Sequence, residues 1–123
     1  MGKAFYGNAR CRHGPGMESG EGRMVIEWQK IRVKPEARDH WLERDLEIWT
    51  AGLARRDGFL GKEVWLGEEE SEVILIVRWM SEEDWKGIPR EHLDDLERRF
   101  GEAISEDVWE RIEMRSYRVA RSS

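Results

Sequence analysis

The stretch SEVILIVRWM, residues 71–80, constrains the fold more than any other, because it predicts a strand that is apolar on both faces. Side chains alternate between the two faces of a strand. One face carries Val73, Leu75, Val77 and Trp79, and the other carries Ile74, Ile76 and Met80 with Arg78 among them. A strand of a small antiparallel sheet normally keeps one face polar and in water. Each face of this strand therefore needs a covering layer.

The rest of the pattern predicts three further strands and two helices. Strands are expected over residues 24–33, 58–67 and 112–120, where apolar side chains alternate. Helices are expected over residues 35–55 and 81–104, because apolar residues recur there at spacings of three and four. The two apolar stripes are Leu42, Leu46, Trp49 and Leu53, and Leu93, Leu96, Phe100 and Ile104. The order β-α-β-β-α-β predicts an α+β, ferredoxin-like fold with a four-stranded antiparallel sheet.

Two helices cover only one face of such a sheet, so the second apolar face needs another partner. Leaving that face in water costs about 1.5–3 kcal/mol for each large apolar side chain. Apolar patches of this size on protein surfaces mark interfaces. The sequence therefore predicts a homodimer, a dimeric α/β barrel, in which two sheets pack face to face and enclose a small cavity.

The first 23 residues differ from the rest of the chain. They are rich in glycine and polar residues and show no apolar period. We expect a flexible N-terminal tail over residues 1–23 and one domain over residues 24–123, with Met24 as an alternative start. Cys11 and His13 lie close together in this tail, but a structural zinc site needs four ligands. No metal site is predicted.

Charge and composition exclude several classes of partner. A formal net charge of −5 argues against a broad nucleic-acid interface. No apolar run approaches the length of a membrane span, and the N-terminus lacks the apolar segment of a signal peptide. The single cysteine, Cys11, is typical of a reducing compartment. We therefore expect a cytoplasmic protein that binds neither nucleic acid nor a membrane.

Three stretches of the chain resemble a known family. MVIEWQKIRVKPEARDHWLERDLEIWT, GFLGKEVW and VILIVRWMSEEDWKGIP are similar to segments of a family of uncharacterised proteins found largely in cyanobacteria. That family resembles the dimeric α/β-barrel superfamily, which includes antibiotic-biosynthesis monooxygenase-like domains. The likeness covers residues 24–119 and implies the same fold and the same dimer. Fold alone does not set function in this superfamily.

Some members of the superfamily degrade heme, and the resemblance allows this activity to be weighed here. Those members use an asparagine on the first strand with a tryptophan and a histidine around the second helix. Trp85 and His92 lie in the corresponding region, but the first strand offers Gln29 and Lys30 in place of the asparagine. Heme degradation is therefore the less favoured function, and no cofactor is predicted.

The candidate ligand-binding residues are polar and aromatic side chains of the strands and of the second helical region. They are Glu27, Gln29, Glu63, Trp65, Arg78, Trp85 and His92. A few polar groups of this kind orient a ligand in an otherwise apolar cavity. Alternatively, Glu63 and Arg78 form a cross-strand ion pair that serves only the dimer. The sequence contains no nucleophile elbow, phosphate-binding loop, dinucleotide fingerprint or HExxH motif.

Two functions remain open on the sequence. The first is a dimer that binds a small hydrophobic ligand in the cavity between the two sheets. The alternative is a cofactor-independent, monooxygenase-like enzyme acting on an aromatic or polycyclic compound, whose substrate supplies the electrons for O₂. Convergent polar groups in the cavity would favour the enzyme. Because the sequence shows no clear acid–base pair, it favours binding.

Overall fold

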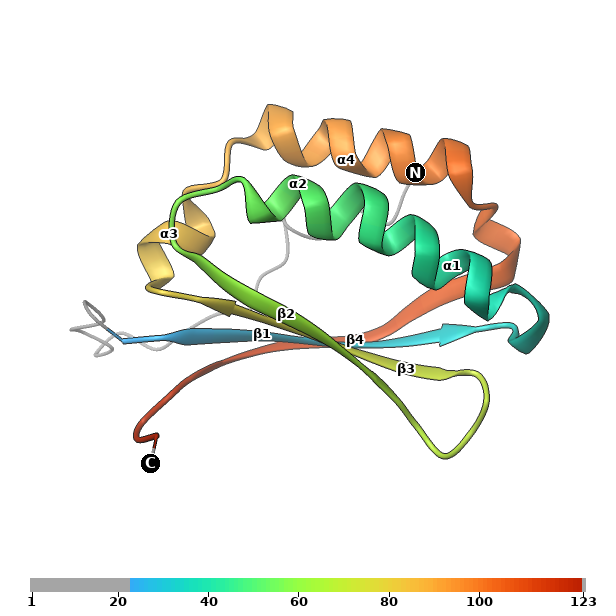
Figure 1. Ribbon diagram of the computed structural model, residues 1–123, viewed down its shortest axis with the longest axis horizontal. Coiled ribbons are helices and arrows are strands. Elements are labelled where there is room, and N and C mark those ends of the chain that lie inside the picture. Colours follow the sequence, from blue (N-terminus) through green and yellow to red (C-terminus); the bar gives the residue numbers. More distant parts are fainter. Residues whose placement is uncertain (1–22, 123) are drawn as a thin grey trace.

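A four-stranded antiparallel sheet carries helices on one of its faces in the computed structural model, which describes residues 23–122 (Figure 1). The strands are β1 (Val25–Val33), β2 (Phe59–Leu66), β3 (Glu72–Trp79) and β4 (Trp109–Arg118). The sheet order is β2-β3-β1-β4, and each neighbouring pair is antiparallel. The helices are α1 (Arg38–Arg44) and α2 (Ala51–Ala54) after β1, and α3 (Glu82–Lys86) and α4 (Arg90–Ala103) after β3. The predicted α+β, ferredoxin-like fold is confirmed.

The expected N-terminal tail lies outside the described residues, apart from Arg23 at its end. Its flexibility therefore stays a prediction, as does the absence of a metal site at Cys11 and His13. None of the helices within residues 23–122 is both long and apolar enough to cross a bilayer.

The first helical run contains a π-helical segment, η2 (Asp45–Thr50), between α1 and α2. Hydrogen bonds in a π-helix join residues five apart, so one turn holds more residues than an α-helical turn. Within this segment Asp45 faces the sheet and is 3% exposed, whereas Leu46 points outward and is 62% exposed. The prediction that Leu46 belongs to the buried stripe is wrong, because the buried face of this helical run is centred on Trp41, Asp45 and Ile48, at α-helical spacings of four and three.

Two strands contain an extra residue that shifts their alternation. In β2, Phe59 pairs with Trp79 but Gly61 already pairs with Arg78, which leaves Leu60 as a bulge. In β4, the register shifts at Ile112, and the strand begins at Trp109 rather than at residue 112 as predicted. A bulge hides the start of a strand from any argument based on strict alternation.

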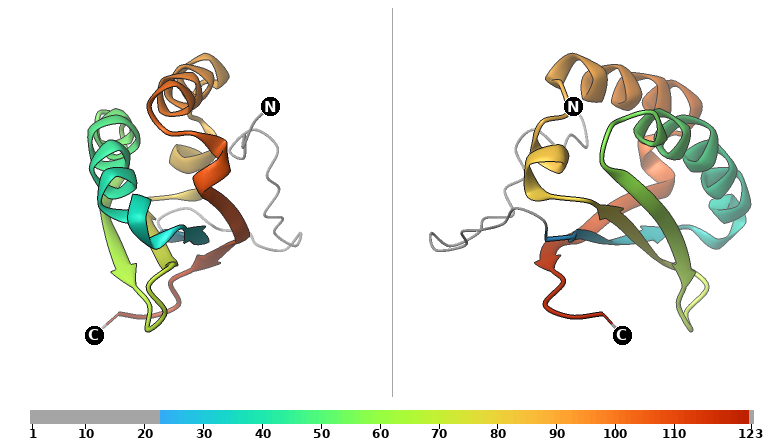
Figure 2. Two further views of the ribbon diagram at one scale, coloured as in Figure 1. Left: turned by 90° about the vertical axis from the view of Figure 1, so that its right-hand side faces the viewer. Right: turned by 60° about the vertical axis from the view of Figure 1, so that its left-hand side comes forward.

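The hydrophobic core lies between the helices and the sheet, and Figure 2 shows α2 and α4 side by side over the strands. The sheet contributes Val25, Ile31, Val33, Val73, Leu75, Val77 and Trp79, and the helices contribute Trp41, Leu53, Leu96 and Phe100. All of these side chains are at most 5% exposed. The helices therefore cover the face of β3 that carries Leu75.

The opposite face of the sheet, here called the open face, carries no helix of residues 23–122 (Figures 1 and 2). Trp28 lies opposite Ile76, and Trp65 lies opposite Ile74, in the strand register. Trp65 is 48% exposed, whereas Ile76, which lies between Trp28 and Glu63 in the register, is only 3% exposed. The open face thus carries the apolar and aromatic side chains predicted for the second face of β3, together with ion pairs such as Lys30–Glu72 and Arg115–Glu113.

The contact between α2 and α4 depends on a glycine, and this gives a matched pair of substitutions. A Cβ atom added to Gly52 would lie 2.5 Å from Cδ2 of the fully buried Leu96, whereas one added to Gly101 in α4 meets nothing within 4 Å. Gly52→Ala should lower the free energy of unfolding by about 1–3 kcal/mol through overpacking. Gly101→Ala should raise it by about 0.5–1 kcal/mol through helix propensity. Urea denaturation of both variants tests the pair, and equal effects would contradict the close helix contact.

Candidate functional site

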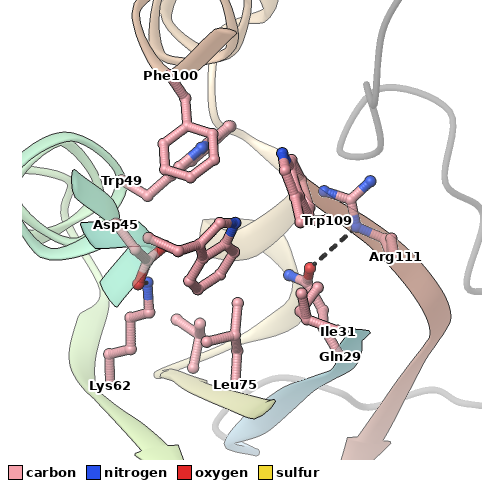
Figure 3. Close-up of a pocket in the computed structure, with 11 residues that line it drawn as sticks. Gln29, Ile31, Asp45, Trp49, Lys62, Leu75, Phe100, Trp109 and Arg111 are labelled. Carbon is pink, nitrogen blue, oxygen red and sulfur yellow. Dashed lines mark hydrogen bonds and ion pairs between the residues drawn. The ribbon is translucent and has the colours of Figure 1, made fainter. Parts of the chain in front are cut away.

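A small cavity, here called the helix–sheet cavity, lies between the helical layer and the sheet (Figure 3). Its volume is about 20 Å³, which is room for about one water molecule. Ile31, Leu75 and Val77 of the central strands form its floor. The cavity is therefore on the side of the sheet away from the open face.

Aromatic side chains form most of the wall of the helix–sheet cavity. Trp41 of α1, Phe100 of α4 and Trp109 of β4 pack edge to face, with all three pairs of ring centroids 5.5 Å apart. Trp49 of η2 completes the wall. The indole Nε1 of Trp41 is buried and has no hydrogen-bond partner among residues 23–122. Such a wall suits a flat, largely apolar molecule.

A buried ion pair closes one side of the cavity. Lys62 of β2 and Asp45 of η2 face each other in Figure 3, with Nζ 2.7 Å from Oδ2. Both side chains are only 4% exposed. Asp45 lies four residues from both Trp41 and Trp49, which places it on the buried face of the helical run, opposite the lysine. A lysine and a carboxylate are thus held together in an otherwise apolar wall.

A chain of hydrogen bonds lies at the opposite side of the cavity. Arg111 of β4 donates from Nε to Oε1 of Gln29 at 3.2 Å, and the Gln29 amide donates from Nε2 to Oε2 of Glu27 at 2.8 Å. The guanidinium of Arg111 also lies over the Trp109 ring, 5.5 Å from its centroid. Burial raises the pKa of the nearby Glu97 carboxyl, and the positive charge of Arg111 opposes that shift. Gln29 is therefore fixed in orientation by a partner at each end.

The structure separates the candidate strand residues between the two faces of the sheet. Gln29 lines the helix–sheet cavity, and Glu27 lies beside it and is fully buried. Glu63, Trp65 and Arg78 are on the open face instead. There Trp65 Nε1 donates to Oε1 of Glu63 at 2.9 Å, and Arg78 Nη2 lies 3.6 Å from Oε2 of the same carboxylate. The cross-strand ion pair predicted for Glu63 and Arg78 is present.

Trp85 and His92 do not line the helix–sheet cavity. Trp85 is 7% exposed and belongs to the hydrophobic core at α3. Nε2 of His92 lies 3.0 Å from the carbonyl oxygen of Gly52, so this histidine joins α4 to α2. Within residues 23–122, no group of three His, Cys, Asp or Glu side chains comes together as a metal site would require.

Sequence reasoning missed the polar half of the cavity, namely Asp45, Lys62 and Arg111. Lys62 left a usable signal, because it is the only charged side chain alternating with Leu60, Val64 and Leu66 in its strand. Asp45 left a weaker signal, because it lies four residues from both Trp41 and Trp49, but the predicted stripe was drawn through Leu42 and Leu46 instead.

Residues 24–88, just over half of the chain, match the model of a family described as antibiotic biosynthesis monooxygenase. No curated protein sequence matches the chain.

Several solved structures share the fold. SnoaB, a cofactor-independent oxygenase from Streptomyces nogalater, aligns with a TM-score of 0.57 and 15% identity over 82% of this chain and 96% of its own. A proposed antibiotic biosynthesis monooxygenase from Bacillus cereus aligns with a TM-score of 0.58 and 25% identity over 83% of this chain and 98% of its own. A similar proposed enzyme from Chloroflexus aurantiacus has a TM-score of 0.57 and 17% identity, and covers 81% and 96% of the two chains.

Proposed function

Because the chain belongs to the antibiotic biosynthesis monooxygenase family, we propose that it binds a small aromatic molecule in the helix–sheet cavity. The observation that carries this proposal is the composition of the cavity wall. Flat rings pack there at one side, and four polar side chains reach the same space, namely Gln29, Asp45, Lys62 and Arg111. Ligand sites are typically apolar with a few placed polar groups of this kind.

This proposal moves the ligand from one face of the sheet to the other. From the sequence, the cavity between two sheets was the expected place. The helix–sheet cavity is preferred because its polar groups converge within a single chain, and because Gln29 already lines it.

The cavity must open before it can hold a ring system, since it has room for about one water molecule. The π-helical segment η2 supplies Asp45 and Trp49 to its wall. Segments of this type occur frequently at functional sites. We infer that binding moves the side chains of η2 outward from the sheet.

Titration with 2-naphthol, followed by tryptophan fluorescence, tests where the ligand binds. Ile31→Phe fills the floor of the helix–sheet cavity and should weaken binding about tenfold or more, as lost shape complementarity does. Ile26→Phe makes the same change on the open face of β1 and should leave the affinity unchanged. The reverse pattern would place the ligand between the sheets, and no binding by the wild-type chain would refute a ligand pocket for such rings.

A second candidate function is oxidation of the bound molecule by O₂ without a cofactor. The convergence of an amide, a carboxylate and two cations on an aromatic cavity supports it. The likeness to SnoaB, a cofactor-independent oxygenase, adds support at the level of fold. Oxygen uptake during the same titration separates the two functions, because binding alone consumes no O₂.

The proposal includes a homodimer formed by the open face, and a cytoplasmic location. Trp28, Trp65 and Ile74 supply an apolar patch on the open face, and the ion pairs around it supply a polar rim of the kind that protein interfaces have. The single cysteine of the chain supports the location.

A further inference from the structure

The buried pair of Lys62 and Asp45 retains hydrogen-bonding capacity that the protein does not use. An ammonium group has three N–H donors, and a carboxylate accepts at two oxygens. The contact between Nζ and Oδ2 is the only side-chain hydrogen bond or ion pair of either residue within residues 23–122. Two donors of Lys62 and one acceptor oxygen of Asp45 therefore stand without a protein partner at the cavity wall.

Burying an ion pair in this position costs free energy. Removing two charges from water costs more than their mutual attraction returns in many proteins, and apolar replacements of similar size are often neutral or stabilising. Here the chain also turns Leu46 into solvent, where it is 62% exposed, and places a carboxylate inward. A buried carboxylate and an exposed leucine thus occupy adjacent helix positions. Neither arrangement favours stability, which points to a different role for the ion pair.

We propose that the Lys62–Asp45 pair is the subsite that recognises a hydroxyl group on the ring of the ligand. The ammonium group of Lys62 donates to the hydroxyl oxygen, and Asp45 accepts the hydroxyl proton in a hydrogen bond. This inference rests on the proposed function, because it requires the helix–sheet cavity to hold a ligand.

The chemistry of the pair selects a hydroxyl over other polar groups. A ligand carboxylate would meet the negative charge of Asp45, and a ligand ammonium would meet the positive charge of Lys62. A hydroxyl group is both donor and acceptor, so it satisfies both residues without adding charge. Its size also matches the room for one water-sized group beside the aromatic wall.

Two probes of nearly equal shape test the inference on the full chain. 2-Naphthol carries the hydroxyl proton, and 2-methoxynaphthalene lacks it. The wild-type chain should prefer 2-naphthol about tenfold to a hundredfold, as expected for hydrogen bonds to charged groups. The double variant Lys62→Met/Asp45→Leu should fold and lose this preference while still binding 2-methoxynaphthalene.

A matched control removes an exposed ion pair of the same length. Arg98 Nη2 lies 2.7 Å from Oδ1 of Asp95 on α4, away from the cavity. Asp95→Leu/Arg98→Met should keep the wild-type preference. Far-UV circular dichroism checks that each variant is folded.

The outcomes separate this inference from the proposed function. Equal affinity of the wild-type chain for the two probes, or a preference that survives in the double variant, overturns the hydroxyl subsite alone. Failure of both probes to bind the wild-type chain overturns the pocket and the subsite together.

Discussion

Replacing Lys62 alone by methionine should lower the free energy of unfolding by about 3–5 kcal/mol, because Asp45 is then a buried carboxylate without its partner. The contact distance of 2.7 Å and the 4% exposure of both side chains place the pair well inside the protein. Removing one partner of such a pair lowers the free energy of unfolding by far more than the intact pair contributes to it. Guanidinium or urea denaturation at neutral pH measures the change.

The double variant Lys62→Met/Asp45→Leu should recover most of that loss, because it leaves no charge in the cavity wall. Arg98→Met serves as the control, since its ion pair with Asp95 is exposed and should contribute little. A single variant as stable as the wild type would mean that water reaches Asp45. A double variant as unstable as the single one would mean that the two charges do not act as a pair.

Adjacent residues of β3 should respond to a charge in different ways. Leu75 is 5% exposed beneath the helices, so Leu75→Glu buries a carboxylate in the core and should prevent folding. The expected cost, on the order of 5 kcal/mol or more, is comparable to the whole stability of a small domain. Loss of the far-UV signal and of cooperative melting would reveal it.

Ile74→Glu places the same charge on the open face and should yield a folded chain that no longer dimerises. A two-fold interface presents the same residues on both sides, so one substitution introduces two charges into it. Sedimentation of the wild-type chain should give twice the chain mass of 14.6 kDa, and the variant should give the single mass. A wild-type chain that stays monomeric at millimolar concentration would contradict the dimer.

The fold could be predicted because apolar residues recur at the periods of strands and helices along the sequence. Alternation in residues 71–80 identified β3 and its two apolar faces, and the stripe ending at Ile104 identified α4. The errors have two origins. The bulges at Leu60 and Ile112 each insert one residue into a strand, and a strictly alternating pattern does not reveal them. At Asp45 the buried stripe is offset by one residue from the stripe drawn through Leu42 and Leu46.

The candidate site was harder to predict, because its residues come from separate elements. Gln29 was identified as an odd polar residue within an apolar strand, and it lines the cavity. The same argument applied to Glu63 and Arg78 led to the open face, because pattern alone does not say which face the helices cover. Asp45 and Lys62 are 17 residues apart in the chain, and only the fold brings them together.

The placement of Asp45 also means that a single helix position sets the chemistry of the cavity. Asp45 lies four residues from both Trp41 and Trp49, so an ordinary helical period already points it toward the sheet. An apolar residue at this position would leave the lysine of β2 facing a hydrocarbon side chain. In this family fold, one substitution on the inner face of the first helical run would therefore convert a polar recognition wall into a plain apolar one.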